Sequence, residues 1–407
     1  MSELAQEHEV HAIPMSRPDG CPFAEPDKFR ALRADQPISR ARLWDGSEAW
    51  LVSRYEDLRT LINDPRLSAE PRRSGYPLVS RAQKAVLGSA SSFVFRDDPE
   101  HNRLRRAVTP EFTGKRVEAM RPRIQEIVDG AIDELLAAEK PADLVKYVGL
   151  PVPTMVICEL LGVPYSERDF FRERNKILNS RECSQEAASK AHHELYVYLD
   201  ELVALKEREP ADDLLSRVLE EQVRPGTVTR GELIVNAILL MLAGQEPTLC
   251  MIGLGMAALL EHPDQYAALG ESQDPKLAEA AVEELLRYLH IQQNGFRRVV
   301  AEDVEVDGVV MREGDGVVLL GESADNDETV FDDPHNLDIT RGTRHHLAFG
   351  HGVHYCLGAP LARVQLQIVF ATLARRVPTL RIAVPLDEVP FRHDMAIYGA
   401  HALPVTW

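Results

Sequence analysis

The sequence predicts a mainly α-helical fold with small β-sheets. Apolar residues recur at spacings of three and four over long stretches, which is the period of a helix with one buried face. Strand-like segments are few and come in pairs, and no alternation of strands and helices indicates a large parallel sheet. With 407 residues, 44% of them apolar and 27% charged, the chain has the composition of a globular protein that buries a large core.

Two Asp-Gly dipeptides predict β-hairpins, because this pair favours the backbone of a two-residue turn. The strands that they join are Ile38–Arg42 with residues 49–53, and Val304–Val306 with Val309–Met311. The helical period predicts ordinary amphipathic helices over residues 55–63, 116–139, 185–207 and 213–221.

Residues 232–261 predict a helix of a different kind. They are apolar on almost every face, which indicates burial in the core rather than a stripe on the surface. At about 1.5 Å per residue this helix is roughly 45 Å long, enough to cross a domain. Gln245, Glu246 and Pro247 interrupt it midway, which argues against a membrane span. A buried carboxylate is costly, so Glu246 either has a function or is hydrogen-bonded beside a proline kink.

The chain is acidic, and its charge excludes some partners. Its 46 Lys and Arg residues against 64 Asp and Glu residues give a formal charge of −18, which disfavours nucleic acid. Residues 1–20 are polar, unlike a secretion signal or a membrane anchor. Five cysteines are scattered without paired spacing, which favours reduced thiols. We therefore expect a cytoplasmic protein that binds neither nucleic acid nor a membrane.

The segment 345–363, HHLAFGHGVHYCLGAPLAR, carries the strongest chemical signal. Its cysteine is bracketed by three glycines, which let a backbone approach a flat ligand closely. These residues are Gly350, Gly352, Cys356 and Gly358. A helix that begins near Leu357 would lower the pKa of the Cys356 thiol through its free amides and its dipole.

Three chemistries fit this cysteine. A thiolate ligand of haem iron explains both the glycines and the helix start. A zinc site is an alternative because His351 and His354 lie nearby, although a second pair of ligands is missing from the local sequence. A nucleophilic cysteine paired with a histidine is the third, and it leaves the glycines unexplained.

The run FGHGVHYCLG, from Phe349 to Gly358, resembles the F-G-x-G-x-H-x-C-x-G loop of cytochrome P450 enzymes. Further motifs of that family occur in the expected order, so the resemblance covers essentially the whole chain. It implies a soluble bacterial haem-thiolate monooxygenase made of one catalytic domain, residues 1–407. It also implies the cytochrome P450 fold, with haem buried between the long central helix and the helix that follows the cysteine loop.

The resemblance also assigns residues that hold the fold and the cofactor. Glu284 and Arg287 in EELLR resemble the E-x-x-R pair, which in the family locks to an arginine that Arg341 would supply. A b-type haem (iron protoporphyrin IX) would have Cys356 as its iron ligand. The other cofactor contacts implied are His101, Arg105 and Arg298, together with Phe349, Gly350, His354 and Gly358 of the loop.

The central helix resembles the family's oxygen-activating segment. A thiolate ligand donates electron density that favours cleavage of the O–O bond of dioxygen. Ala243, Gly244, Gln245 and Glu246 match A-G-x-[DE], in which small residues leave room for oxygen and the acid relays protons.

The next position departs from the family, which normally has threonine there. Here Pro247 comes first and Thr248 one place later. Proline has no hydroxyl, and it frees the carbonyl of Ala243 from its helical hydrogen bond. Thr248 shifted by a kink, an ordered water or a substrate group would then replace the missing hydroxyl. We expect proton delivery to depend on Glu246.

By the same analogy, two segments line the substrate pocket. The predicted lining residues are Gln292, Gln293, Asn294, Met395 and Ala396, with further walls from residues 71–95 and 170–184. Polar side chains after the E-x-x-R helix indicate a substrate with hydrogen-bonding groups, a small molecule or a peptide. Exposure of an ordinary surface loop is the alternative.

Electrons must come from outside, because the sequence contains no flavin or iron–sulfur motif. We expect NAD(P)H to supply them through a ferredoxin reductase and a ferredoxin. A basic cluster on the cysteine-loop side fits an acidic ferredoxin, and a solvated helix face is the alternative. The cluster consists of Arg103, Arg106, Lys115, Arg116 and Arg363.

The expected function is hydroxylation or another oxidation of a specialised metabolite with O2. Oxidative cross-linking of aromatic groups, by C–C or C–O coupling on a peptide or carrier-bound substrate, is the alternative that Pro247 favours. A haem protein that no longer activates oxygen is a third possibility for the same reason.

Overall fold

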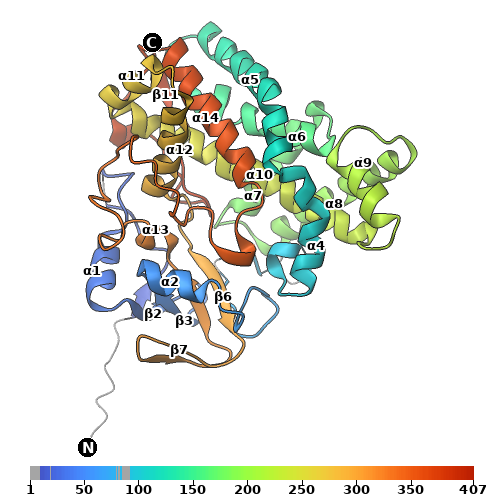
Figure 1. Ribbon diagram of the computed structural model, residues 1–407, viewed down its shortest axis with the longest axis vertical. Helices are drawn as coiled ribbons and strands as arrows, with labels where there is room; N and C mark the ends of the chain where they lie inside the picture. Colours follow the sequence, from blue (N-terminus) through green and yellow to red (C-terminus); the bar gives the residue numbers. More distant parts are fainter. Residues whose placement is uncertain (1–9, 19, 79, 81–82, 85–91) are drawn as a thin grey trace, which may run out of the picture.

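The computed structural model describes residues 10–18, 20–78, 80, 83–84 and 92–407. Helices make up one part of the molecule, and a small sheet with short flanking helices lies at the other end (Figure 1). The long helix α10 (Arg230–Leu260) runs through the helical part. The prediction of a mainly α fold with small sheets is therefore confirmed.

The predicted helices are present, with ends that differ by a few residues. They are α2 (Tyr55–Leu61), α5 (Gly114–Ala137), α8 (Gln185–Arg208) and α9 (Leu214–Val218), the last of which continues as a π-turn, Leu219–Val223. The helix after the cysteine loop, α14 (Ala359–Arg376), begins two residues later than expected. Further helices are α1 (Asp27–Asp35), α4 (Glu100–Val108), α6 (Pro151–Leu161), α7 (Arg168–Asn179), α11 (Pro263–Glu271), α12 (Pro275–Leu289) and α13 (Gly321–Ala324).

Both predicted hairpins form, and the first belongs to a mixed six-stranded sheet. Its strand order is β1 (Val10–Ala12), β2 (Ile38–Arg42), β3 (Glu48–Val52), β9 (Gly316–Leu319), β6 (Phe296–Val300) and β4 (Leu67–Ser68). Strands β3 and β9 pair in parallel although more than 260 residues separate them in the sequence. The second hairpin is β7 (Val304–Val306) with β8 (Val309–Met311), and a small sheet joins β5 (Ala142–Asp143), β11 (Pro404–Thr406) and β10 (Arg381–Ile382).

Helix α10 is the centre of the core. A capping box begins it, in which Thr229 and Glu232 satisfy each other's backbone amides. Its side chains pack against α6, α8 and α14. Among the described helices it alone is long and apolar enough to span a membrane, yet 72% of its most apolar window is buried inside the protein. The prediction of a central core helix is confirmed.

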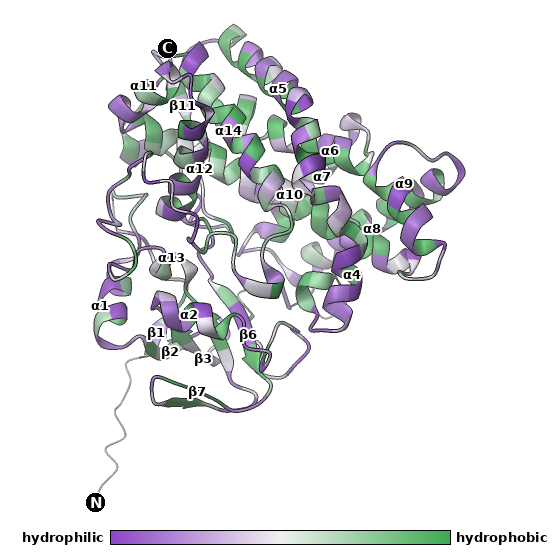
Figure 2. Cartoon of the chain, viewed as in Figure 1, coloured by the Kyte–Doolittle hydropathy of each residue, from purple (hydrophilic) through white to green (hydrophobic). Residues whose placement is uncertain are grey.

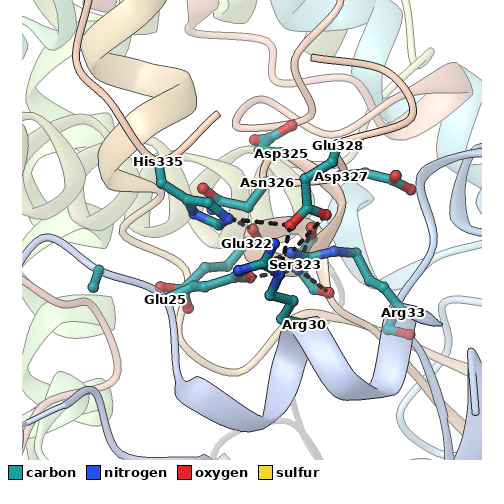
Figure 3. A network of polar contacts seen from close by, with 12 residues as sticks. Glu25, Arg30, Arg33, Glu322, Ser323, Asp325, Asn326, Asp327, Glu328 and His335 are labelled. Carbon is teal, nitrogen blue, oxygen red and sulfur yellow. Dashed lines mark hydrogen bonds and ion pairs between the residues drawn. The ribbon is translucent and has the colours of Figure 1, made fainter. Parts of the chain in front are cut away.

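A buried polar network joins the N-terminal helix α1 to α13 (Figure 3). Arg33 of α1 donates to both carboxylate oxygens of Glu25 at 2.6 Å, and to the carbonyl and hydroxyl oxygens of Ser323. Two residues along, Asp325 accepts a hydrogen bond of 2.6 Å from the backbone amide of Leu347. Leu347 lies just before the cysteine loop, so the Asp325 carboxylate holds the backbone at the start of that loop.

Candidate functional site

Cys356 lies where the sequence placed it, just before α14. The backbone amides of Gly358 and Ala359 act to lower the pKa of its thiol, as expected at a helix N-terminus, and the amide of Ala359 donates to the carbonyl oxygen of Cys356 at 3.3 Å. Its own amide donates to the carbonyl oxygen of Phe349 at 2.9 Å, which closes the loop into a tight turn. The sulfur is therefore held at a defined position.

The predicted net lowering of the Cys356 pKa is wrong. Burial raises the pKa of this thiol above its ordinary value, although the two amides and the charges of Arg105 and Arg363 act in the opposite direction. A thiolate at such a site needs a compensating cation, and a metal ion bound to sulfur supplies one. The sulfur of Cys356 is therefore suited to be the ligand of a metal ion.

The glycines of the loop have distinct roles. Gly350 and Gly352 have φ angles of +71° and +70°, a region that favours glycine. A Cβ atom on Gly352 would also lie 1.8 Å from Oδ1 of Asn63. Gly358 differs, because no atom lies within 4 Å of the place where its Cβ would stand. The loop is thus tightly packed on one side and borders open space at Gly358.

Four basic residues gather beside this loop, as predicted. The rings of His101 and His354 are 4.3 Å apart, and Arg298 is only 8% exposed. Burial, followed by the charges of Arg298, His101 and Arg105, lowers the pKa of His354 to about 3. Burial likewise lowers the pKa of Arg298. The cluster therefore carries positive charge that is incompletely compensated.

These four residues fit the propionates of haem. Both ring nitrogens of His101 are buried without a hydrogen-bond partner, although the Asp98 carboxylate lies 3.4 Å from Nδ1. Orphaned buried donors are rare in folded proteins, and a pair of carboxylates would satisfy them. Arg105 has a second contact, because its guanidinium donates to the carbonyl oxygen of Tyr355 at 2.6 Å.

The predicted lock between α12 and the segment before the cysteine loop is present. Arg287 donates two hydrogen bonds to Glu284, at 2.8 and 2.9 Å, and Arg341 donates a third at 3.1 Å. Glu284 and Arg287 are completely buried. Arg287 also donates to the carbonyl oxygen of Asp325, which ties this lock to the network of Figure 3.

A second carboxylate on α12 was missed. Glu283 accepts hydrogen bonds from Arg363 at 2.6 and 2.8 Å and from His346 at 3.1 Å. Burial alone would raise the pKa of Glu283, but the hydrogen bonds of His346 and Arg363 outweigh it and lower the pKa to about 2. The doubled glutamate in EELLR was the only signal in the sequence.

One face of α10 borders open space. Ala243 is exposed midway along the helix, whereas Met241 and Gln245 are buried. Pro247, one turn later on the same face, is partly exposed, and the helix continues through it. This is the face that the family resemblance directs toward haem and oxygen. Thr248 is buried.

Two of the predicted oxygen-side residues are explained differently by the structure. A Cβ atom on Gly244 would lie 2.7 Å from Cδ1 of Ile157, so this glycine lets α10 and α6 pack closely. Gln245 donates to the hydroxyl of Thr154 at 2.7 Å and accepts from Asn175 at 2.9 Å. Helix packing replaces room for oxygen as the reason for Gly244, and Gln245 links α10 to α6 and α7.

Glu246 is held in a buried network whose partners the sequence did not predict. Its carboxylate forms an ion pair with Arg392 and accepts from Asn175 at 3.2 Å. Arg392 also donates to the sulfur of Cys250 at 3.2 Å. Of the two interpretations of Glu246, hydrogen bonding inside the protein is confirmed, and it leaves a role in proton relay open.

The two predicted pocket segments do lie together. Asn294 donates to the carbonyl oxygen of Ala396 at 3.2 Å, and Gln293 donates to that of Arg392 at 3.4 Å. Met395 is buried, while Gln292 is partly exposed. Two of the three polar side chains are thus used to hold the C-terminal turn. In the predicted wall 71–95, residues 79, 81–82 and 85–91 lie outside the described residues.

The predicted basic cluster is weaker than its sequence indicates. Arg103 pairs with Glu100 and Glu232 at 2.6 and 2.5 Å, Arg116 with Glu111, and Arg363 with Glu283. Helix α4 remains strongly hydrophilic (Figure 2), and Arg106 and Lys115 are exposed. Carboxylates therefore compensate three of the five cations, and Arg363 belongs to the interior of the site.

The zinc alternative finds no ligand set in the described part of the chain. No three His, Cys, Asp or Glu side chains there are placed to hold a metal ion together. Cys356 is therefore suited to a metal that another group, such as a porphyrin, already holds.

Comparison with known proteins agrees with this site. The family model named Cytochrome P450 matches residues 170–377. Cytochrome P450 GfsF of Streptomyces halstedii is 50% identical over 396 residues, which cover 97% of this chain and 95% of GfsF. Vitamin D3 dihydroxylase of Streptomyces griseolus is 44% identical over 403 residues, 99% of this chain and 98% of that protein.

Solved structures show the same fold over nearly the whole chain. The crystal structure of GfsF has a TM-score of 0.91 and 49% identity, and covers 98% of this chain and 100% of that one. The mycinamicin VIII C21 methyl hydroxylase MycCI of Micromonospora griseorubida also has a TM-score of 0.91, at 40% identity and the same coverage. The predicted fold is thereby confirmed, and the chain belongs to the cytochrome P450 family, as an oxidoreductase of the monooxygenase type.

Proposed function

We propose that this monooxygenase oxidises a specialised metabolite, with haem b held by Cys356 and electrons supplied by NAD(P)H through a ferredoxin reductase and a ferredoxin. The observation that carries the proposal is the pairing of two features in one place. Cys356 lies at the start of α14 in a loop closed by its own backbone hydrogen bond to Phe349, and in the basic cluster beside it both ring nitrogens of His101 are buried without a hydrogen-bond partner.

In this proposal the chain binds and orients the cofactor with few residues. Cys356 supplies the thiolate, and the propionates are held by His101, Arg105, Arg298 and His354. Gly358 would leave space for the porphyrin ring of the haem. Phe349 and Gly350 shape the loop. Bound haem supplies the oxidising chemistry with O2 and external electrons. Family membership favours this role for Cys356 over a nucleophile.

The distal side would control water and protons. The exposed face of Ala243 and Pro247 lines the space where oxygen and substrate meet. Glu246 is the carboxylate next to this face on α10, and its ion pair with Arg392 holds it in place. To move a proton, Glu246 must exchange Arg392 for water or a substrate group. Pro247 offers no hydroxyl to this relay, so Thr248 is the remaining candidate on α10 for the hydroxyl that the family's threonine supplies.

The substrate class rests on the relatives and the pocket. MycCI is named as a methyl hydroxylase and was solved with mycinamicin VIII, which favours hydroxylation of a metabolite here. The partly exposed Gln292 is the polar side chain that we assign to substrate, with Asn294 and the Met395–Ala396 turn behind it. Oxidative aromatic coupling remains the second candidate, and Pro247 is the observation that favours it.

We place ferredoxin docking on the cysteine-loop side. The cations that carry it are Arg106 and Lys115, because Arg103, Arg116 and Arg363 are compensated by glutamates. We infer a cytoplasmic protein. We also infer one catalytic domain over residues 1–407, because among the described residues one large hydrophobic cluster takes side chains from Phe23 to Val405, with two smaller clusters around the sheet.

The test combines a ligand screen with product analysis. Purified protein reconstituted with a ferredoxin and its reductase is screened for metabolites that shift the spin state of the ferric iron. Hydroxylation adds one oxygen to the product mass, whereas coupling removes two hydrogens. A colourless protein, or a reduced carbon-monoxide complex without the red-shifted band of a thiolate ligand, contradicts the proposal.

A further inference from the structure

Adjacent carboxylates on α12 serve different partners. Glu284 faces Arg287 and Arg341, which is the lock that the family motif implies. Glu283 faces Arg363 of α14, with two hydrogen bonds of 2.6 and 2.8 Å, and the carboxylate is 3% exposed. The helix thus contacts the two sides of the cysteine loop through two separate ion pairs.

Arg363 connects this second pair to the residues on either side of Cys356. Its guanidinium donates to the phenol oxygen of Tyr355 at 2.9 Å and lies 4.6 Å from the centre of the Phe349 ring. Tyr355 directly precedes Cys356, and Phe349 accepts the backbone hydrogen bond of Cys356. A bidentate, stacked guanidinium holds such a geometry far better than a lysine would.

The same pair also sets the charge near the sulfur. Arg363 and Arg105 both contact Tyr355, the residue before Cys356, and the positive charge of each acts on Cys356. Glu283 neutralises Arg363, whereas Arg105 donates to a neutral acceptor of the loop, the carbonyl oxygen of Tyr355. Removing either member of the pair therefore changes the local charge, and the two changes have opposite signs.

We propose that Glu283 and Arg363 are positioning residues that hold the cysteine loop and balance the charge around Cys356, and that they thereby tune the reduction potential of the bound haem iron. This inference rests on the proposed haem-thiolate function. It assigns a role to two residues that neither touch substrate nor belong to the E-x-x-R motif.

The test measures the midpoint potential of the ferric/ferrous couple by dye-mediated titration with dithionite, without substrate. Glu283→Gln leaves Arg363 uncompensated, which favours the more negative ferrous form and raises the potential. Arg363→Met leaves Glu283 uncompensated and lowers it. An uncompensated charge at such a site changes the equilibrium constant on the order of tenfold, which for one electron is about 59 mV.

The same helix offers a matched control. Glu279 lies one turn before Glu283 and pairs with Arg344 at 3.3 Å, but these side chains are 44% and 70% exposed. Glu279→Gln and Arg344→Met make the same chemical changes in water, so they are expected to leave the potential unchanged. Shifts of opposite sign at Glu283 and Arg363, absent from the controls, support the proposal.

Arg363→Lys separates charge from geometry. Lysine keeps the positive charge but loses the two-point contact with Glu283 and the bond to Tyr355. We expect a potential near that of the wild type, together with a larger fraction of carbon-monoxide complex that lacks the thiolate band. A complete thiolate band in this variant contradicts the positioning role.

Other outcomes are equally decisive. Potential shifts of the same sign in Glu283→Gln and Arg363→Met, or shifts no larger than those of the controls, overturn the charge-balancing role. If the wild-type protein itself shows no thiolate band, the proposed function fails before the pair is tested. Thermal unfolding of all five variants shows whether a lost band merely reflects unfolding.

Discussion

Arg392 is expected to hold Glu246 in place by charge, and its replacement by methionine tests this directly. Both side chains are almost completely buried, at 7% and 8% exposure, and they form an ion pair that joins α10 to the C-terminal turn. Without the guanidinium, Glu246 keeps, within the described part of the chain, only the hydrogen bond of 3.2 Å from Asn175. A buried carboxylate is then left largely uncompensated.

The expected loss of stability follows from that arrangement. Removing one partner of a buried ion pair costs about 3–5 kcal/mol, because the other charge stays buried. An unfolding entropy of about 2.1 cal/mol/K per residue, over 407 residues, gives roughly 0.9 kcal/mol/K. The melting temperature of Arg392→Met is therefore expected to fall by about 3–6 °C.

The double variant Arg392→Met/Glu246→Gln removes both charges and decides the interpretation. Replacing both members of a buried pair is often neutral, so the double variant is expected to recover most of the lost stability. Thermal unfolding, monitored by circular dichroism, is measured for the wild type, Arg392→Met, the double variant and Glu246→Gln. If the double variant is less stable than Arg392→Met, the pair does not stabilise the protein through charge, and this reasoning is refuted.

Three further predictions follow from the site. Arg298→Leu is expected to speed haem transfer to apomyoglobin at least several-fold, because a buried cation of the basic cluster is lost, whereas Arg297→Leu on the other face of β6 is not. The pKa of Glu283 is about 2 in the folded protein against 4.5 ordinarily, which adds about 3 kcal/mol to the free energy of unfolding. This contribution is complete above about pH 4.5 and is lost as the pH falls toward 2. The difference in melting temperature between wild type and Glu283→Gln should therefore narrow on acidification, and a constant difference would contradict this. Reversing the charges of Arg106 and Lys115 is expected to slow reduction by ferredoxin and weaken its dependence on salt, whereas Arg103→Gln should have the smaller effect in stopped-flow experiments because Arg103 is already paired.

Local features of this protein were readable from its sequence. The Asp-Gly turns predicted both hairpins, and the apolar run of residues 232–261 predicted the buried helix α10. The cysteine loop was also readable, because its glycines and its helix start are neighbours in the chain and act on Cys356 through backbone geometry alone. A β-turn, a helix start and the spacing of apolar residues each depend on residues a few places apart in the chain. They can therefore be predicted from the sequence alone.

What the side chains contact was decided only by the tertiary structure. Arg392 lies 146 residues from Glu246, and nothing near either residue indicates the other. Arg363 belonged to a basic cluster in the sequence, but packing of α12 on α14 turns it toward Glu283 and away from a docking role. The net pKa of Cys356 was mispredicted for the same reason. Charge compensation and burial depend on which distant segments meet in the core, and that is a property of the assembled fold.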